Sequence, residues 1–196
     1  METSAGQLLS DASIRVPKML KPDLSGPRKM RRERILYTLE ELPKIPRLPS
    51  PKFTFAHIVA PHSPSVFGPN GEPVDKNVEG ALGYRDQLIY LNKLVLPVLQ
   101  QIIASSETPP IIILQADHGG VRTNLQDRMR ILNAYYLPDG GIEVLYPSIS
   151  PVNTFRKILN YYFGTNYPQL DDTAYHSGYD LPYDYTVVKD SRPGCP

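Results

Sequence analysis

The most informative segment of this 196-residue sequence is PPIIILQADHGG, residues 109–120. Four aliphatic residues follow one another at 111–114, and three of them are β-branched. Such a run is too short for a typical helix and indicates a strand buried on both faces, which we expect to be a central parallel strand. The strand then delivers Asp117 and His118, followed by two glycines.

Asp117 and His118 fall where a binding site is expected, because ligands of open α/β sheets lie at the carboxyl ends of the strands. A carboxylate beside an imidazole suits a divalent metal such as zinc or manganese. Gly119 and Gly120 allow the backbone to turn sharply and to approach a ligand closely. The alternative interpretation is a plain exit from strand to loop, in which Asp117 caps a turn.

The composition fits one soluble globular domain, with 41% hydrophobic and 21% charged residues. A formal net charge of +1 gives no electrostatic case for a nucleic-acid partner. The 21 prolines amount to about twice the usual share of ~5%. Because they crowd the region before residue 75, we expect that region to be rich in loops.

The single cysteine, Cys195, excludes an intramolecular disulfide framework without identifying a compartment. No apolar run approaches the ~18 residues of a membrane span. Residues 1–10 lack the basic and then apolar pattern of a signal peptide. The sequence therefore predicts neither a membrane span nor an export signal in this chain.

Three helices are predicted after a poorly ordered segment at 1–25. The first covers 27–42, and Pro27 suits the first position of a helix. Its basic run is better explained as a solvated helix face than as a surface that binds anionic lipid or nucleic acid. The second covers 84–105 and carries an apolar stripe that Pro97 interrupts. The third covers 150–164. It has a serine cap and a terminal glycine, and its predicted buried face comprises Val152, Phe155, Leu159, Tyr162 and Phe163.

Further strands are predicted at 53–59 and 131–137, with a short strand at 185–188. The first of these, followed by the helix at 84–105 and the strand at 111–114, would form a right-handed crossover unit. It ends in Pro61-His62-Ser63-Pro64, where two prolines restrict the backbone around His62. A rigid histidine at the carboxyl end of a strand is a candidate site residue. His57, within the strand, is better explained as a core histidine.

Four pieces of the sequence, taken in order, resemble one family. They are the strand leading into Pro61-His62-Ser63-Pro64, the long helix beginning Tyr84-Arg85-Asp86-Gln87, the motif Gln115-Ala116-Asp117-His118-Gly119, and the helix start Ser150-Pro151-Val152-Asn153-Thr154-Phe155-Arg156. In this order they resemble the carboxyl-terminal half of the alkaline-phosphatase-like superfamily, in its sulfatase and lipoteichoic-acid-synthase-like branch.

The resemblance implies an α/β fold over residues 26–190, a partial three-layer α/β/α sandwich with a mostly parallel sheet, followed by a tail at 191–196. It implies that Asp117 and His118 are metal ligands, and that His62 contacts the phosphate or sulfate of an ester substrate, or a second metal. The cofactor would be a divalent cation, with zinc, manganese, calcium and magnesium all open. Such a cation polarises an ester oxygen and helps activate a hydroxyl nucleophile.

The sequence also departs from the family pattern. The amino-terminal half of similar proteins supplies the nucleophile and a further acidic ligand, yet nothing before Phe53 resembles that half and Cys195 cannot supply the nucleophile motif. We therefore expect this chain to be a fragment that is inactive alone and whose partner is the missing half. The family resemblance implies that the parent protein is membrane-anchored and has an exported catalytic domain. The alternative is a degenerate, non-catalytic interaction module.

Overall fold

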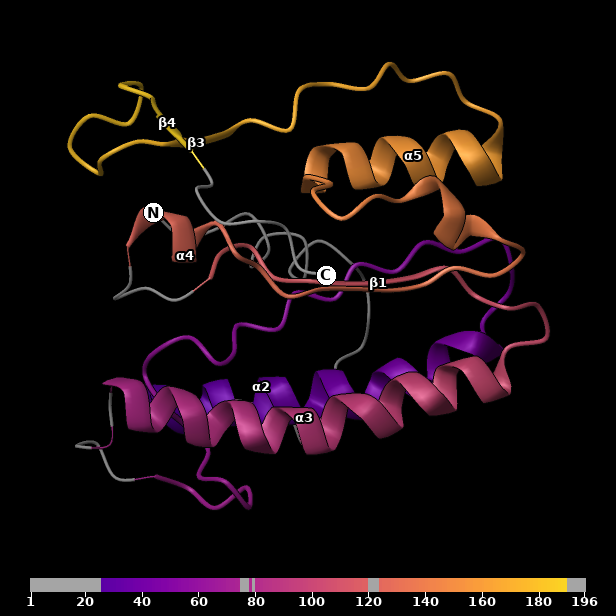
Figure 1. Cartoon of the computed structure of the whole chain (residues 1–196). Coiled ribbons are helices and arrows are strands. Elements are labelled where there is room, and N and C mark those ends of the chain that lie inside the picture. Colours follow the sequence, from indigo (N-terminus) through magenta and orange to yellow (C-terminus); the bar gives the residue numbers. More distant parts are fainter. Residues whose placement is uncertain (1–25, 75–77, 79, 120–123, 190–196) are drawn as a thin grey trace. The chain divides into compact units, whose positions relative to one another are not determined.

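The chain divides into two compact units, one ending at Ser105 and the other beginning at Ser106. The computed structural model describes residues 26–74, 78, 80–119 and 124–189, and each unit is considered by itself (Figure 1). The predicted disorder at 1–25, the tail at 191–196 and Gly120 lie outside the described residues.

The first unit is helical. Helix α2 covers Pro27–Glu41, the 3₁₀ helix η2 covers Leu42–Arg47, and α3 covers Gly80–Ser105. Pro27 occupies the first turn of α2, which confirms the predicted helix and its start. Helix α3 also confirms its prediction and continues through Pro97. Figure 1 shows α2 and α3 side by side, with η2 contacting both.

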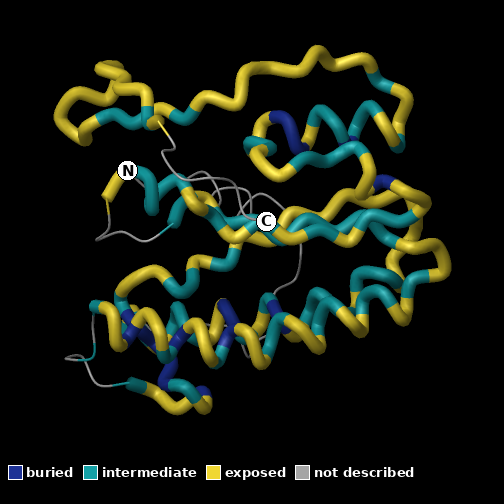
Figure 2. The backbone as a smooth tube through the Cα atoms, viewed as in Figure 1, coloured by how far each residue is buried: buried dark blue, intermediate teal, exposed yellow. Residues whose placement is uncertain are grey.

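The core of the first unit is a small apolar cluster (Figure 2). Ile35 and Leu39 come from α2, Leu91 comes from α3, and Val66 and Phe67 come from the intervening loop. Phe67 is fully buried. Full burial of one such side chain contributes about 1.5–3 kcal/mol to stability. The helices therefore pack around a loop, whereas the predicted crossover unit would have packed α3 on a sheet.

Helix α3 is long and apolar enough to cross a membrane, by length and composition alone. In this unit its buried residues are Gly83, Gln87 and Leu91, and its apolar window of 18 residues is only 6% buried. Lys93 lies in the middle of the helix and donates to Pro69 O at 2.8 Å and to Asn70 Oδ1 at 3.1 Å. A lysine at the centre of a membrane costs about 2.5–3.5 kcal/mol. A membrane-spanning placement of α3 would therefore carry this cost.

The second unit contains two small antiparallel sheets. Strand β1 (Ile112–Gln115) pairs with β2 (Asn133–Tyr136), with Ile112 opposite Tyr136. Strand β3 (Ala174–His176) pairs with β4 (Thr186–Val188). These positions confirm the predicted strands at 111–114, 131–137 and 185–188.

The predicted parallel sheet is wrong, and so is the partial three-layer α/β/α sandwich. Among the described residues between β1 and β2 the chain forms the one-turn helix α4 (Leu125–Arg128), and β2 runs beside β1 in the opposite direction. All four residues of β1 are half-buried, rather than buried on both faces. A parallel sheet requires longer crossover connections that cover both faces.

The strand predicted at 53–59 is also wrong. This segment pairs with no strand among the described residues, and Phe53 and Phe55 are 85% and 80% exposed. Aromatic and β-branched composition favours a strand only where a neighbouring strand completes the hydrogen-bond ladder. The predicted crossover unit is consequently not formed. His57 is exposed, so its interpretation as a core histidine is wrong too.

Helix α5 (Pro151–Phe163) confirms its predicted limits, and Gly164 ends it with a φ of 63°. Its buried residues are Asn153, Thr154 and Ile158, so the predicted face is wrong, and Val152, Phe155 and Phe163 are exposed. Preceding it, the 3₁₀ helix η3 covers Gly141–Val144. Polar groups dominate the buried face because the helix start is bonded to a distant loop.

That bonding centres on the carboxylate of Asp172. Its Oδ1 accepts from Ser150 N and from Asn153 Nδ2, both at 2.8 Å, and its Oδ2 accepts from Tyr146 OH at 2.5 Å. Ser150 occupies the predicted cap position, but its hydroxyl makes no cap bond. A carboxylate far along the chain therefore satisfies donors at the start of α5, where negative charge is favoured.

Candidate functional site

The carboxyl end of β1 carries Asp117 and His118. Pairing with β2 extends one residue beyond the strand, because Ala116 N donates to Leu132 O at 2.9 Å. The next side chain, Asp117, is 85% exposed, and His118 is 27% exposed. The short hairpin therefore presents both groups at the surface of the second unit, open to a ligand from solvent.

The ring of His118 is oriented by its own backbone. Nδ1 lies 2.7 Å from Gly119 O, and a carbonyl only accepts, so Nδ1 carries a proton. Metal-binding histidines use this arrangement, because it leaves Nε2 as the ligand atom. Nε2 lies 3.7 Å from Asp117 Oδ2. Two ligands of one tetrahedral zinc ion are about 3.4 Å apart. A small side-chain rotation would therefore let both atoms bind one cation.

Gly119 fixes the pair against α4. Its N–H donates to Arg128 O at 2.6 Å. A Cβ at this position would lie 2.2 Å from Asp127 O and 2.5 Å from Arg130 O. The sequence predicted that a glycine here allows a close approach. In this structure the close neighbour is the carbonyl group at the end of α4.

Two donors form only part of a metal site. Within the described residues, no group of three or more His, Cys, Asp or Glu side chains could hold a metal ion. A catalytic zinc normally has three protein ligands. Asp117 and His118 thus fit a divalent cation chemically, and they would need further ligands from water, substrate or another protein segment.

His62 belongs to the first unit, where it is exposed. Its Nδ1 lies 2.5 Å from the carbonyl of Ser63, so this nitrogen also carries a proton. Nε2 is left to meet a ligand. To donate to an anion, Nε2 must be protonated as well, and the ring is then a cation. To bind a metal, Nε2 must instead be unprotonated.

The segment around His62 is bonded to the arginines of α2. Arg31 Nη1 donates to Ser63 O at 2.7 Å, and Arg28 Nη1 donates to Ser65 O at 2.6 Å. Arg32 donates to Val66 O at 3.3 Å and to Gly71 O at 2.5 Å, and its guanidinium lies 4.6 Å from the centroid of the Phe67 ring. The basic run predicted as a solvated face therefore holds a loop.

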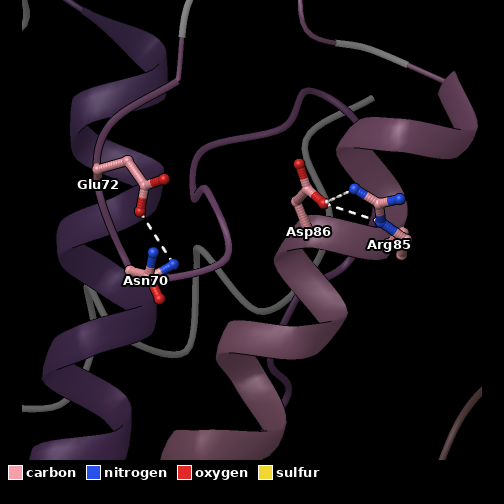
Figure 3. A network of polar contacts seen from close by, with 4 residues as sticks. All are labelled: Asn70, Glu72, Arg85 and Asp86. Atoms are coloured by element: carbon pink, nitrogen blue, oxygen red, sulfur yellow. Dashed lines mark hydrogen bonds and ion pairs between the residues drawn. The ribbon is translucent and has the colours of Figure 1, made fainter.

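A tight turn follows at 68–72. Gly68 N donates to Glu72 O at 2.8 Å, and Asn70 N donates to Glu72 Oε2 at 2.9 Å (Figure 3). On the nearby start of α3, Arg85 and Asp86 bond to one another at 2.7 Å, as Figure 3 also shows. Both side-chain bonds are local, because each joins residues only one or two positions apart in the sequence.

The sequence contains a signal for these loop contacts that the prediction of a solvated helix face did not include. Arg28 and Arg32 are four residues apart and continue the row of Ile35 and Leu39, so all four share one face of α2. In α3 the buried row runs from Gly83 through Gln87 to Leu91, at intervals of four residues. Polar residues that extend an apolar row are candidates for buried hydrogen bonds.

Comparisons with known proteins found no matching family model, no similar curated protein and no similar solved structure.

Proposed function

We propose that this chain carries the metal-binding portion of a hydrolase or transferase that acts on phosphate or sulfate esters. One observation carries the proposal: β1 ends in an exposed carboxylate and an imidazole whose Nε2 lies 3.7 Å from Asp117 Oδ2. The motif resemblance to the alkaline-phosphatase-like superfamily supports the same residues as ligands. The resemblance supports only the chemistry of the site. It does not support the fold, because the parallel sheet that it implies is not formed among the described residues.

In this proposal Asp117 and His118 hold a divalent cation, with zinc, manganese, calcium and magnesium as candidates. When bound, the cation polarises an ester oxygen and favours attack by a hydroxyl group. Asp117 supplies negative charge, and His118 supplies Nε2 because its Nδ1 is already bonded to Gly119 O. We assign the nucleophile to no residue of this chain, and we expect another segment to provide it.

His62 contacts the phosphate or sulfate group through Nε2. Because Nδ1 already donates to Ser63 O, this contact requires the doubly protonated ring. Binding of the anion at this position requires a proton on Nε2, whereas binding of a second metal would require Nε2 without a proton.

A titration with Mn²⁺ tests the metal ligands, since this paramagnetic ion broadens nearby NMR signals even when binding is weak. We expect substoichiometric Mn²⁺ to broaden the signals of Asp117, His118 and Gly119 in the full chain. Asp117→Ala and His118→Ala should each weaken the effect roughly tenfold or more. Asp180→Ala, another exposed aspartate of the second unit, is the matched control. Equal broadening in all four proteins would remove the ligand assignment.

A non-catalytic interaction module is the second candidate. The observation that favours it is the small donor set, because two ligands are gathered among the described residues where a catalytic zinc has three. The same titration decides between the two. If Mn²⁺ and Zn²⁺ leave the signals of Asp117 and His118 unchanged at millimolar concentration, the module is the better description.

A further inference from the structure

Gln87 connects the two ends of the His62 segment. Its Nε2 donates to Pro61 O at 3.1 Å, and its Oε1 accepts from Val66 N at 2.9 Å. The side chain comes from α3 and is only 1% exposed. A buried amide requires partners for both its donor and its acceptor, and Gln87 finds both on the backbone that brackets His62.

The rest of the segment is held from other directions. Val66 and Phe67 anchor its carboxyl end in the apolar core. Arg31 and the ring of His62 both donate to Ser63 O, at 2.7 and 2.5 Å. The bond from Nδ1 to Ser63 O depends on the backbone at 62 and 63, which lies within the stretch that Gln87 bonds at both ends. Gln87 is the one buried side chain that bonds both ends of that stretch in the described structure.

We propose that Gln87 is the positioning residue for His62. By fixing Pro61 and Val66 relative to one another, it keeps Nδ1 on Ser63 O and presents Nε2 to the anionic group in one orientation. The inference rests on the proposed function, in which His62 contacts a phosphate or sulfate. Residues that orient a ligand-binding histidine in this way affect affinity without touching the ligand.

The two bonds of Gln87 specify the substitutions. Gln87→Met keeps the length of the side chain but removes both the donor and the acceptor. Gln87→Glu keeps the shape. Its carboxylic acid form can donate to Pro61 O and accept from Val66 N, whereas the ionised form can only accept. Lys93→Met is the matched control, because it removes bonds from the same helix to Pro69 O and Asn70 Oδ1, outside the segment.

The first measurement is the ¹⁵N NMR spectrum of the four histidine rings in the full chain, assigned by single His→Gln substitutions. It reports which ring nitrogen carries the proton. We expect the Nδ1–H form for His62 in the unsubstituted protein and in Lys93→Met. In Gln87→Met the population should move toward the Nε2–H form, because the bond to Ser63 O is no longer enforced.

The second measurement is a titration of the same proteins with inorganic phosphate, observed at the His62 ring. We expect Gln87→Met to weaken binding roughly tenfold or more and Lys93→Met to leave it unchanged. An unchanged tautomer together with unchanged phosphate affinity in Gln87→Met would overturn the inference. If the tautomer shifts but phosphate never affects the His62 ring of the unsubstituted protein, the positioning role is supported and the proposed anion contact fails.

Gln87→Glu keeps the test decisive if Gln87→Met does not fold. As the pH rises and the introduced carboxyl group ionises, its bond to Pro61 O is lost. The His62 tautomer should then move toward Nε2–H in this variant, with no matching step in the unsubstituted protein. The absence of that step in a folded Gln87→Glu protein would also overturn the inference.

Discussion

The two units bury different chemistry. The first unit buries an apolar cluster at Ile35, Leu39, Val66, Phe67 and Leu91. In the second unit, Ile158 is the one buried hydrophobic residue among those described, and it is accompanied by buried Asn153 and Thr154. The first unit also buries Ser65 and Gln87, so the two units differ in buried apolar residues rather than in buried polar ones. The apolar cluster therefore stabilises the first unit, whereas a polar network around the start of α5 organises the second.

This difference bears on the candidate site residues. His62 belongs to a segment that ends in the apolar core, so the orientation of its ring is tied to the stability of the first unit. Asp117 and His118 follow a two-stranded hairpin, and such a hairpin is at most marginally stable alone. A cation that binds the pair would therefore also stabilise the hairpin, since a ligand favours the state that binds it.

Phe67→Ala offers the largest effect. We expect it to lower the free energy of unfolding of the first unit by about 3–5 kcal/mol, because it empties a fully buried site in the apolar cluster. Hydrogen exchange followed by NMR should show faster exchange of amides in α2 and α3, with little change in α5. Phe53→Ala is the matched control, since Phe53 is 85% exposed. Equal effects of the two substitutions would contradict the proposed core.

Two glycines with positive φ sharpen the contrast. Gly71 has a φ of 89°, and a Cβ there would lie 2.3 Å from the ring of Tyr90, which packs on Phe67 with centroids 5.1 Å apart. Gly164 has a φ of 63°, and a Cβ there would meet nothing within 4 Å. Gly71→Ala should therefore destabilise by about 3 kcal/mol, from strain and overpacking, and Gly164→Ala by about 1 kcal/mol, from strain alone.

Urea denaturation of the two alanine variants measures these costs. A Gly164→Ala protein as unstable as Gly71→Ala would show that the space around Tyr90 is not close-packed, and the apolar description of the first unit would fail with it.

Asn153→Ala tests the polar side of the comparison. The amide of Asn153 donates to Leu170 O at 2.7 Å and to Asp172 Oδ1 at 2.8 Å, and it accepts from Leu170 N at 3.0 Å. We expect a loss of about 2 kcal/mol, because the fully buried Asn153 side chain makes three hydrogen bonds, one of them to a carboxylate. Hydrogen exchange should now accelerate in α5 and leave α2 unchanged. Val152→Ala, at an exposed neighbouring position, should have little effect.

The helices show what local sequence determines. Pro27, the row of Ile35 and Leu39, and Gly164 each act through nearby backbone, so the limits of α2 and α5 were predictable. The β-branched run at 111–114 likewise predicted β1. The direction of its pairing was not predictable in this way, because it depends on how the chain returns from Gln115 to Asn133.

The candidate site divides along the same line. Asp117 and His118 are adjacent in sequence, so their proximity followed from the motif alone. The contacts of Gln87 with Pro61 and Val66, and of Asp172 with Tyr146, join residues more than twenty positions apart. The periodicity within one helix or strand does not encode such pairs. Of these residues, Gln87 alone had a sequence signal of burial, because it lies on the same face of α3 as Leu91.

The smallest expected effect concerns pH and the network at α5. Partial burial tends to raise the pKa of Asp172, but hydrogen bonds from Ser150, Tyr146 and Asn153 outweigh it and lower the pKa to about 2, from an ordinary value of 3.8. A lowered pKa in the folded state means that the ionised carboxylate stabilises the fold. This contribution is complete above the unfolded-state pKa and is lost as the pH falls from about 4 to about 2.

Because Asp172 is exposed, solvent screens its bonds, and we expect the contribution to be only about 1 kcal/mol. The measurement is the free energy of unfolding of the native chain and of Asp172→Asn at neutral pH and at about pH 2. The two proteins should differ at neutral pH and converge in acid, whereas Asp180→Asn should track the native chain throughout. If the difference in the free energy of unfolding persisted undiminished in acid, Asp172 would act through its shape rather than its charge. The second unit would then resemble the first more closely than its buried residues suggest.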